Sequence, residues 1–202
     1  MTSPSRRRKA LPAASNVAGS DDCGPTDDAL AQIIAGCQSG ERTAQRRLYE
    51  RYERRLVRLA SRMVGEQDAA DVVQDVFLLV FRKVHQFSGR AHFDTWLYRL
   101  AANQCLAHLR QRKRKQLPGL AVEPTEPSIS VEQRAEQRDL LQAALGSLEP
   151  ELRCVFLLKE DEGLSYQEIA EVLQMAEGTI GSRLNRARRQ LRQRLVELGW
   201  EP

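Results

Sequence analysis

Aromatic residues and long apolar stretches are scarce in this 202-residue sequence. Phe, Trp and Tyr together make up 5% of it, so any hydrophobic core must be mostly aliphatic, which favours helices. No apolar run approaches the roughly 20 residues that a membrane-spanning helix needs. A basic cluster at residues 6–9 is not followed by the long apolar core of a secretory signal. We therefore expect a cytoplasmic protein without membrane insertion.

Cysteine is also rare, and its spacing is not that of a metal site. Four cysteines stand at positions 23, 37, 105 and 154, without a C-x-x-C pair or a zinc-ligand spacing to the three histidines. Small buried thiols are the expected state of these residues. The sequence also lacks a Gly-rich phosphate loop, a G-x-S-x-G elbow and an H-E-x-x-H segment. We expect no catalytic residues, no metal and no cofactor, and hence no enzyme.

Two segments rich in proline, glycine and small polar residues divide the sequence. Residues 1–25 lack hydrophobic periodicity and are predicted to form a disordered tail. Residues 116–131 contain three prolines and a glycine and are predicted to form a linker. The remaining parts, 26–115 and 132–202, show helical spacing of apolar residues rather than the alternation of strands. The sequence therefore predicts an all-α protein of two small helical domains joined by a flexible linker.

The second predicted domain contains the pattern of a helix-turn-helix. Ser147 is placed to cap a helix that has Pro150 in its first turn. Ser165 and Glu168 form an S-x-x-E capping box at the start of the next, short helix. A short break at residues 174–178 then precedes a basic helix. Two short helices joined by a tight turn, the second of them basic, are typical of helix-turn-helix domains.

The basic helix has two different faces at 3.6 residues per turn. Its apolar stripe is suited to pack on a small core and consists of Ile180, Leu184, Ala187, Leu191, Leu195 and Leu198. The opposite face carries most of the arginines, and no acidic residue occurs in 179–196. A membrane-surface helix is disfavoured because the domain core already needs the apolar side. Nucleic-acid contact is favoured over a merely solvated face.

Contact with nucleic acid would divide the polar residues of this helix into two groups. Those near its N-terminus would point at base edges: Thr179, Ser182, Arg183, Asn185 and Arg186. Those further along would meet phosphates: Arg188, Arg189 and Arg192. The net charge of +4 suits a polyanionic partner only because these charges are localised.

Residues 68–87 of the first domain predict an amphipathic helix with a second, unusual face. Its core stripe follows i, i+3, i+4 spacing from Ala69 to Val84. The other face carries Asp71, Gln74, Asp75 and Leu78. An exposed leucine among acids suggests a protein-docking surface. The pattern alone is equally consistent with an ordinary amphipathic helix that exposes one leucine.

Residues 93–116 predict another helix of the first domain, with Asp94 as a candidate N-terminal cap. Its predicted buried line is Leu97, Leu100, Ala101 and Cys105, and a neighbouring line carries Trp96, Arg99, Asn103, Leu106 and Arg110. An aromatic ring, an amide and a basic run at 110–115 on one side suit single-stranded DNA. Trp96 could equally be a core residue, and the basic end also suits the helix macrodipole.

Four segments in order closely resemble the sigma-70 family of RNA polymerase sigma factors, in its extracytoplasmic-function (ECF) group. They read DAADVVQDVF, FDTWLYRLAANQ followed by the basic run, LEPELRCVFLLKEDEGLSYQEIA and GTIGSRLNRARRQL. The resemblance covers residues 27–198 and implies a promoter-specificity subunit, with sigma region 2 in the first domain and region 4 in the second. The partners that it implies are the RNA polymerase core, promoter DNA and an anti-sigma factor.

The resemblance also implies roles for individual residues of the first domain. Asp71, Gln74 and Asp75, beside Leu78, match the helix that docks on the β′ clamp helices. Asn103 matches the polar residue near a flipped base of the −10 element, and Phe87 and Leu100 match the pocket of that base. The loop 88–92 matches the recognition loop, so the expected −10 surface is Phe87, Ser88, Gly89, Arg90, Trp96, Arg99, Leu100, Asn103 and Arg110.

In the second domain, Ser182, Arg183, Asn185 and Arg186 match the positions that read the −35 element, and the domain should also rest on the β-flap. Two positions depart from the family pattern. Arg90 stands where relatives often carry an acid, and Gly181 stands where many carry Lys or Arg, so promoter preference is expected to differ.

Two other functions remain open. A stand-alone helix-turn-helix regulator would bind duplex DNA without polymerase, but it would leave the docking face and the basic helix end of the first domain unused. A structural or adaptor protein would carry its basic faces merely solvated.

Overall fold

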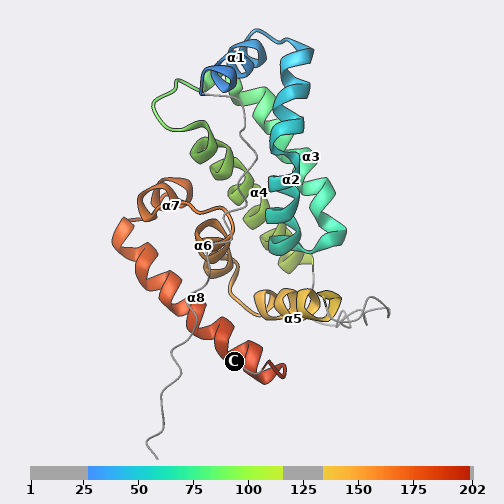
Figure 1. Cartoon of the computed structure of the whole chain (residues 1–202), viewed down its shortest axis with the longest axis vertical. Helices are drawn as coiled ribbons and strands as arrows, with labels where there is room; N and C mark the ends of the chain where they lie inside the picture. Colours follow the sequence, from blue (N-terminus) through green and yellow to red (C-terminus); the bar gives the residue numbers. More distant parts are fainter. Residues whose placement is uncertain (1–26, 116–133, 201–202) are drawn as a thin grey trace, which may run out of the picture.

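The computed structural model describes residues 27–115 and 134–200, and the regular elements in these two ranges are all helices (Figure 1). The first domain contains α1 (Asp27–Gln38), α2 (Arg42–Val64), α3 (Glu66–Lys83), the 3₁₀ turn η1 (Val84–Gln86) and α4 (Phe93–Lys115). The second contains α5 (Arg134–Gly146), α6 (Pro150–Glu160), α7 (Tyr166–Leu173) and α8 (Glu177–Glu197). The all-α, two-domain prediction is confirmed. The predicted tail (1–25) and linker (116–131) lie outside the described residues.

The first domain is organised around α2, which packs against α1, α3 and α4. Its buried side chains recur every three or four residues at Leu48, Tyr52, Leu56, Leu59 and Met63. This spacing places them on one stripe of the helix. The predicted core stripe of α3 is buried as expected, with Phe81 only partly covered.

A single glycine makes the reversal between α2 and α3. Gly65 has φ of 99°, a left-handed conformation that a side chain disfavours, and its N–H donates to the carbonyl of Ser61. The two long helices can therefore turn back on each other without a longer loop.

The helix-turn-helix predicted in the second domain is confirmed, although α8 begins at Glu177, inside the predicted break of 174–178. The Ser165 hydroxyl accepts a hydrogen bond from the Glu168 N–H at 3.2 Å, and the Glu168 carboxylate accepts one from the Ser165 N–H at 2.8 Å. After α7 the chain turns at Gln174, which takes a left-handed φ of 54°. The predicted stripe of α8 is buried at Ile180, Leu184, Ala187 and Leu191, and its last members Leu195 and Leu198 are partly buried.

Two capping predictions were wrong. Helix α6 begins at Pro150, so Glu149 is its N-cap, and the Ser147 hydroxyl instead donates to the Ala144 carbonyl at 2.7 Å. A proline at the first helical position leaves the cap to the residue just before it. Helix α4 begins at Phe93, so Asp94 lies inside the first turn, where its carboxylate accepts from the Tyr52 hydroxyl and from Arg55.

The two domains are in contact, with α7 beside α4, and α5 and α6 against α2 (Figure 1). The buried Arg153 of α6 donates to the Met63 carbonyl at the end of α2 and to the Gly146 carbonyl at the end of α5, both at 2.6 Å. A guanidinium at two helix C-termini satisfies carbonyls that have no partner within their own helices.

Ser165→Ala should lower the free energy of unfolding by about 1 kcal/mol, because the N–H of Glu168 loses its capping oxygen. Hydrogen bonds from Ser165 hold the pKa of Glu168 below its usual value. Their contribution is therefore present above the normal carboxyl pKa and is lost as the pH falls and Glu168 protonates. Urea denaturation at pH 7 and at acid pH measures both effects, and Ser165→Asp, which retains a capping oxygen, is the control.

Candidate nucleic-acid and protein interfaces

The polar face of α8 gathers all the residues expected to meet duplex DNA. Ser182, Asn185, Arg186, Arg188, Arg189 and Arg192 are exposed, and Thr179 and Arg183 are partly buried. The Ser182 hydroxyl donates back to the Thr179 carbonyl at 2.9 Å. Since the apolar stripe is packed on α6 and α7, this polar face is turned away from the domain core.

Acidic residues from α6 and its flanks approach the same face, which sequence reasoning on α8 alone missed. Arg183 pairs with Glu151 at 2.5 Å, Arg186 pairs with Glu149 at 3.2 Å, and Arg188 pairs with Glu160. Within the described ranges Arg189 and Arg192 pair with no carboxylate. Such exposed pairs are weak and easily exchanged for other anions.

Packing does not impose the glycine at position 181. A Cβ added there would meet the Tyr166 ring at 3.7 Å, an ordinary van der Waals distance. The packing of the second domain therefore does not require a glycine at this position.

The aromatic residues of the expected −10 surface form one cluster. Trp96 lies with its ring centre 5.5 Å from Phe87 and 5.4 Å from Phe93, and it is partly buried. Trp96 is therefore held in a packed cluster and is not a freely exposed stacking platform. Leu100 is buried, whereas Arg99, Asn103 and Arg110 are exposed. Gln38 fixes the start of the adjacent loop by donating to the Phe87 carbonyl at 2.9 Å.

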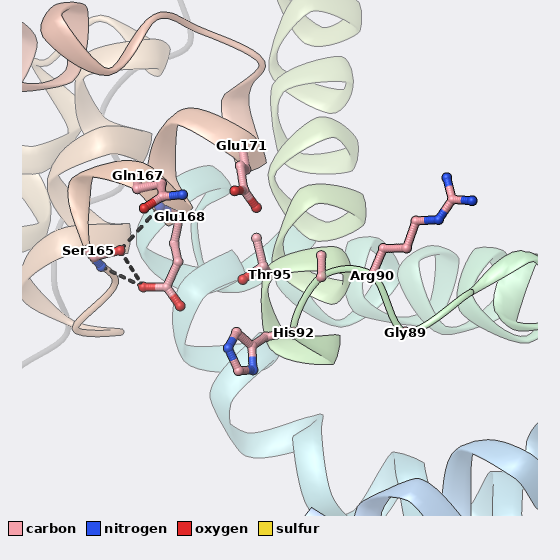
Figure 2. Close-up of a pocket in the computed structure, with 9 residues that line it drawn as sticks. Gly89, Arg90, His92, Thr95, Ser165, Gln167, Glu168 and Glu171 are labelled. Atoms are coloured by element: carbon pink, nitrogen blue, oxygen red, sulfur yellow. Dashed lines mark hydrogen bonds between the residues drawn. The ribbon is translucent and has the colours of Figure 1, made fainter.

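The loop expected to recognise the −10 element, which carries Ser88, Gly89 and Arg90, faces the second domain. A cavity of about 420 Å³ lies between this loop and α7 (Figure 2), and it is lined by Gly89, Arg90, Ala91, His92, Thr95, Ser165, Gln167, Glu168 and Glu171. The His92 ring lies toward Glu168, whereas Arg90 extends away from both carboxylates (Figure 2). Sequence patterns alone did not indicate that these segments meet.

The second face of α3 is part of a wider apolar surface. Asp71, Gln74 and Asp75 are exposed, and Leu78 is 57% exposed. Leu78 borders a groove of about 460 Å³ between α2 and α3, lined by residues that include Tyr49, Val57, Gln74, Leu78 and Phe81. A leucine that continues an apolar groove favours protein docking over an ordinary amphipathic helix.

Metal ligands do not cluster in the part of the chain that the structure describes. Cys37, Cys105 and Cys154 are buried free thiols, as expected, and burial raises the pKa of Cys105 to about 12. Cys23 lies outside the described residues. Among the described helices, none has the length and hydropathy needed to cross a membrane.

Comparison with known families identifies both domains. The model for Sigma-70 region 2 matches residues 48–115, and the model for Sigma-70 region 4 matches residues 138–191. The chain is 34% identical over 177 residues to the RNA polymerase sigma-H factor of Pseudomonas aeruginosa, which covers 81% of this chain and 92% of that protein. The chain belongs to the ECF group of the sigma-70 family.

Further relatives agree with this assignment. The ECF RNA polymerase sigma-E factor of Haemophilus influenzae is 31% identical over 187 residues, 86% of this chain and 97% of that protein. The solved structure of CnrH in complex with the cytosolic domain of CnrY is similar over 86% of this chain and 100% of that chain, with a TM-score of 0.65 and 26% identity. Sigma factors act in transcription initiation and are not enzymes.

Glu149→Gln and Glu151→Gln should each tighten binding of the full chain to duplex DNA by about 2- to 5-fold at low salt, because each removes a carboxylate that competes with phosphate for an arginine. The gain should fade as salt screens the pair. Fluorescence anisotropy with a labelled duplex measures it. Asp139→Asn is the matched control, because Asp139 is an exposed acid of α5 that forms no ion pair within the described residues. An equal gain in DNA affinity in the control would show that the effect comes from net charge and not from the loss of a specific ion pair.

Proposed function

We propose that this sigma factor brings the RNA polymerase core to promoters by reading the −35 element with α8 and the −10 element with α4 and the loop 88–92. The observation that carries this proposal is the polar face of α8. It stands outward at the end of a helix-turn-helix whose apolar stripe is buried. A recognition helix in the major groove needs this division of faces.

For the −35 element, the geometry supports base contacts by the N-terminal part of α8 and phosphate contacts by the part that follows. An arginine can donate two hydrogen bonds to a guanine edge and an asparagine can pair with an adenine edge, which suits Arg186 and Asn185. Thr179, Ser182 and Arg183 lie on the same N-terminal part of the helix. Arg188, Arg189 and Arg192 are placed to hold phosphates and to fix the register.

On the −10 side, the first domain would capture an unpaired base. Removing a base from the stack costs a few kcal/mol, and a pocket that binds the extruded base offsets this cost. Phe87 and Leu100 provide apolar walls, and the exposed Asn103 provides a hydrogen-bonding group nearby. Arg99, Arg110 and the basic end of α4 would follow the phosphates of the single strand.

For polymerase docking, we propose that Asp71, Gln74, Asp75 and Leu78 of α3 bind the β′ clamp helices and that the second domain rests on the β-flap. The apolar groove beside Leu78 supports the first contact. An anti-sigma partner is also proposed, since CnrH was solved with the cytosolic domain of CnrY. Polymerase binding would place the protein in the cytoplasm.

Run-off transcription with core polymerase and genomic promoter fragments tests the proposal. Transcripts that need both core enzyme and this chain are the expected result. Tight operator binding by the chain alone, without transcription, would favour a stand-alone regulator. The absence of any salt-dependent DNA binding, even with polymerase present, would favour an adaptor.

Asn185→Ala and Arg186→Ala should each change −35 preference while binding to core polymerase survives. Loss of a good base contact should cost about 1–3 kcal/mol at the base that it reads and little elsewhere. Transcription from a panel of −35 variants measures the change in preference, and gel filtration with core enzyme measures docking. Equal loss of core binding would contradict the assignment.

Leu78→Ala should weaken core binding by about tenfold while −35 preference is retained, because the exposed leucine would fill an apolar site on the partner. Val196→Ala is the control, since Val196 is similarly exposed at 52% but lies at the end of α8. Equal affinities of the two variants for core polymerase would show that Leu78 is not part of the docking surface.

A further inference from the structure

Three arginines form a stripe on α2 that the promoter contacts described above do not use. Arg55, Arg58 and Arg62 are spaced by three and four residues, so they fall within about 60° of one another around the helix. Their side chains are 33–48% exposed. At 1.5 Å per residue, the stripe is about 10 Å long. We call these three residues the arginine stripe.

Two acidic residues of the second domain cover the arginine stripe. Asp161 and Glu162 follow α6, and Asp161 pairs with Arg62. Glu162 lies 3.4 Å from both Arg55 and Arg58, and it also accepts a hydrogen bond from the Tyr98 hydroxyl. The acids are far more buried than the arginines, with the Glu162 side chain 1% exposed and that of Asp161 13% exposed.

Because these acids are buried, their contact with the arginine stripe is stable only while the two domains stay together. A carboxylate removed from water is stabilised only while its partners remain in place. Both acids lie in one domain and the three arginines lie in the other, so separation of the domains returns the carboxylates to water. Arg55 would keep Asp94, at 3.1 Å in its own domain, whereas Arg58 and Arg62 would lose the carboxylates that they contact here.

The uncovered stripe has the dimensions of a phosphate site. Each strand of duplex DNA carries one charge per 3.4 Å of helix axis, so about 10 Å corresponds to about three phosphates. Arginine is well suited to phosphate because its planar guanidinium donates several hydrogen bonds. The stripe also adjoins α4, since Arg55 holds Asp94 in the first turn of that helix. DNA held along α4 could therefore continue onto α2.

We propose that the arginine stripe binds the DNA backbone and that Asp161 and Glu162 act as a phosphate mimic that occupies it while the two domains are closed. Backbone phosphates displace the two carboxylates, and the domains separate. The inference deepens the proposed function by adding a DNA contact and a closed state. It can nevertheless be tested without polymerase or a promoter sequence.

The test uses the full chain with Asp161→Asn and Glu162→Gln together, which removes both charges at nearly constant size. The probe is a fluorescent 30-base-pair duplex without promoter sequence, studied by anisotropy across a salt series. Binding at 0.1 M salt should tighten by about tenfold, because phosphates no longer compete with the mimic. Small-angle X-ray scattering without DNA should show a larger radius of gyration than that of the unaltered chain.

The matched control is Asp139→Asn with Glu197→Gln, which changes the charge of the second domain by the same amount at two exposed positions. Because Glu197 pairs with Arg194, this control also releases one arginine that lies outside the stripe. It should change affinity by less than threefold and leave the radius of gyration unaltered. An equal gain in DNA affinity in the control would overturn the proposal that Asp161 and Glu162 act as a phosphate mimic. An unchanged radius of gyration in Asp161→Asn, Glu162→Gln would overturn the closed state.

A second set of variants tests whether the DNA binds at the arginine stripe. Adding Arg58→Ala and Arg62→Ala to the neutralised chain should abolish the gain in affinity. It should also reduce the slope of log affinity against log salt by about 1.8, since each phosphate contact contributes about 0.9. A gain that survives both changes would place the DNA elsewhere and overturn the proposal. Circular dichroism and thermal unfolding verify that each variant is folded.

These outcomes are independent of the run-off assay. The DNA affinity could rise in the neutralised chain and fall again when the arginines are removed, while the run-off assay yields no transcript. That result would support the arginine stripe and contradict the proposed function. Transcription by the unaltered chain, without tighter DNA binding by the neutralised chain, would support the proposed function and contradict the arginine stripe.

Discussion

Repulsion among arginines is the constraint that the arrangement of this molecule must satisfy. Arginines are concentrated on α2 and α8, and α6 lies against both of these helices. The carboxylates in and beside α6 point to both sides, with Glu149, Glu151 and Glu160 toward α8 and Asp161 and Glu162 toward α2. One short acidic segment thus compensates two basic helices, and in doing so it brings the two domains together.

Arg153 explains why α6 can occupy this central position. Its guanidinium is buried among the carbonyls of Met63, Gly146 and Leu148, so it joins the ends of α2 and α5 to α6. Burial lowers the pKa of this arginine, because the charged form has lost water. The carbonyl dipoles replace that water only at this orientation of the helices. The contact is therefore directional, whereas the exposed ion pairs around it tolerate exchange.

Local signals predicted the local structure well. The Ser165 and Glu168 capping box and the apolar stripe of α8 were readable because each depends on residues within one or two turns. The Ser147 cap failed because Pro150 fixed the helix start two residues later than a serine cap would require. Trp96 could not be placed from its own helix, since its packing partner Phe87 lies before the intervening loop.

Contacts between separate helices account for most of what the sequence did not reveal. The absence of acids in 179–196 was correctly noted, yet carboxylates of α6 reach the arginines of α8 across the domain. The arginine stripe was overlooked altogether, because its meaning depends on Asp161 and Glu162, which lie about a hundred positions later. Helical periodicity identifies which residues share a face, but not what covers that face.

The contact between the domains affects the two proposed DNA surfaces unequally. The polar face of α8 is largely exposed, and its ion pairs with Glu149 and Glu151 are exchangeable. The loop 88–92 instead shares a cavity with Glu168 and Glu171 of α7 (Figure 2). A strand of DNA entering that cavity would bring phosphates toward two carboxylates, and the repulsion between like charges is unfavourable. Under the proposed function, capture of a −10 base by this loop would therefore require α7 to withdraw, whereas reading of a −35 element by α8 would not.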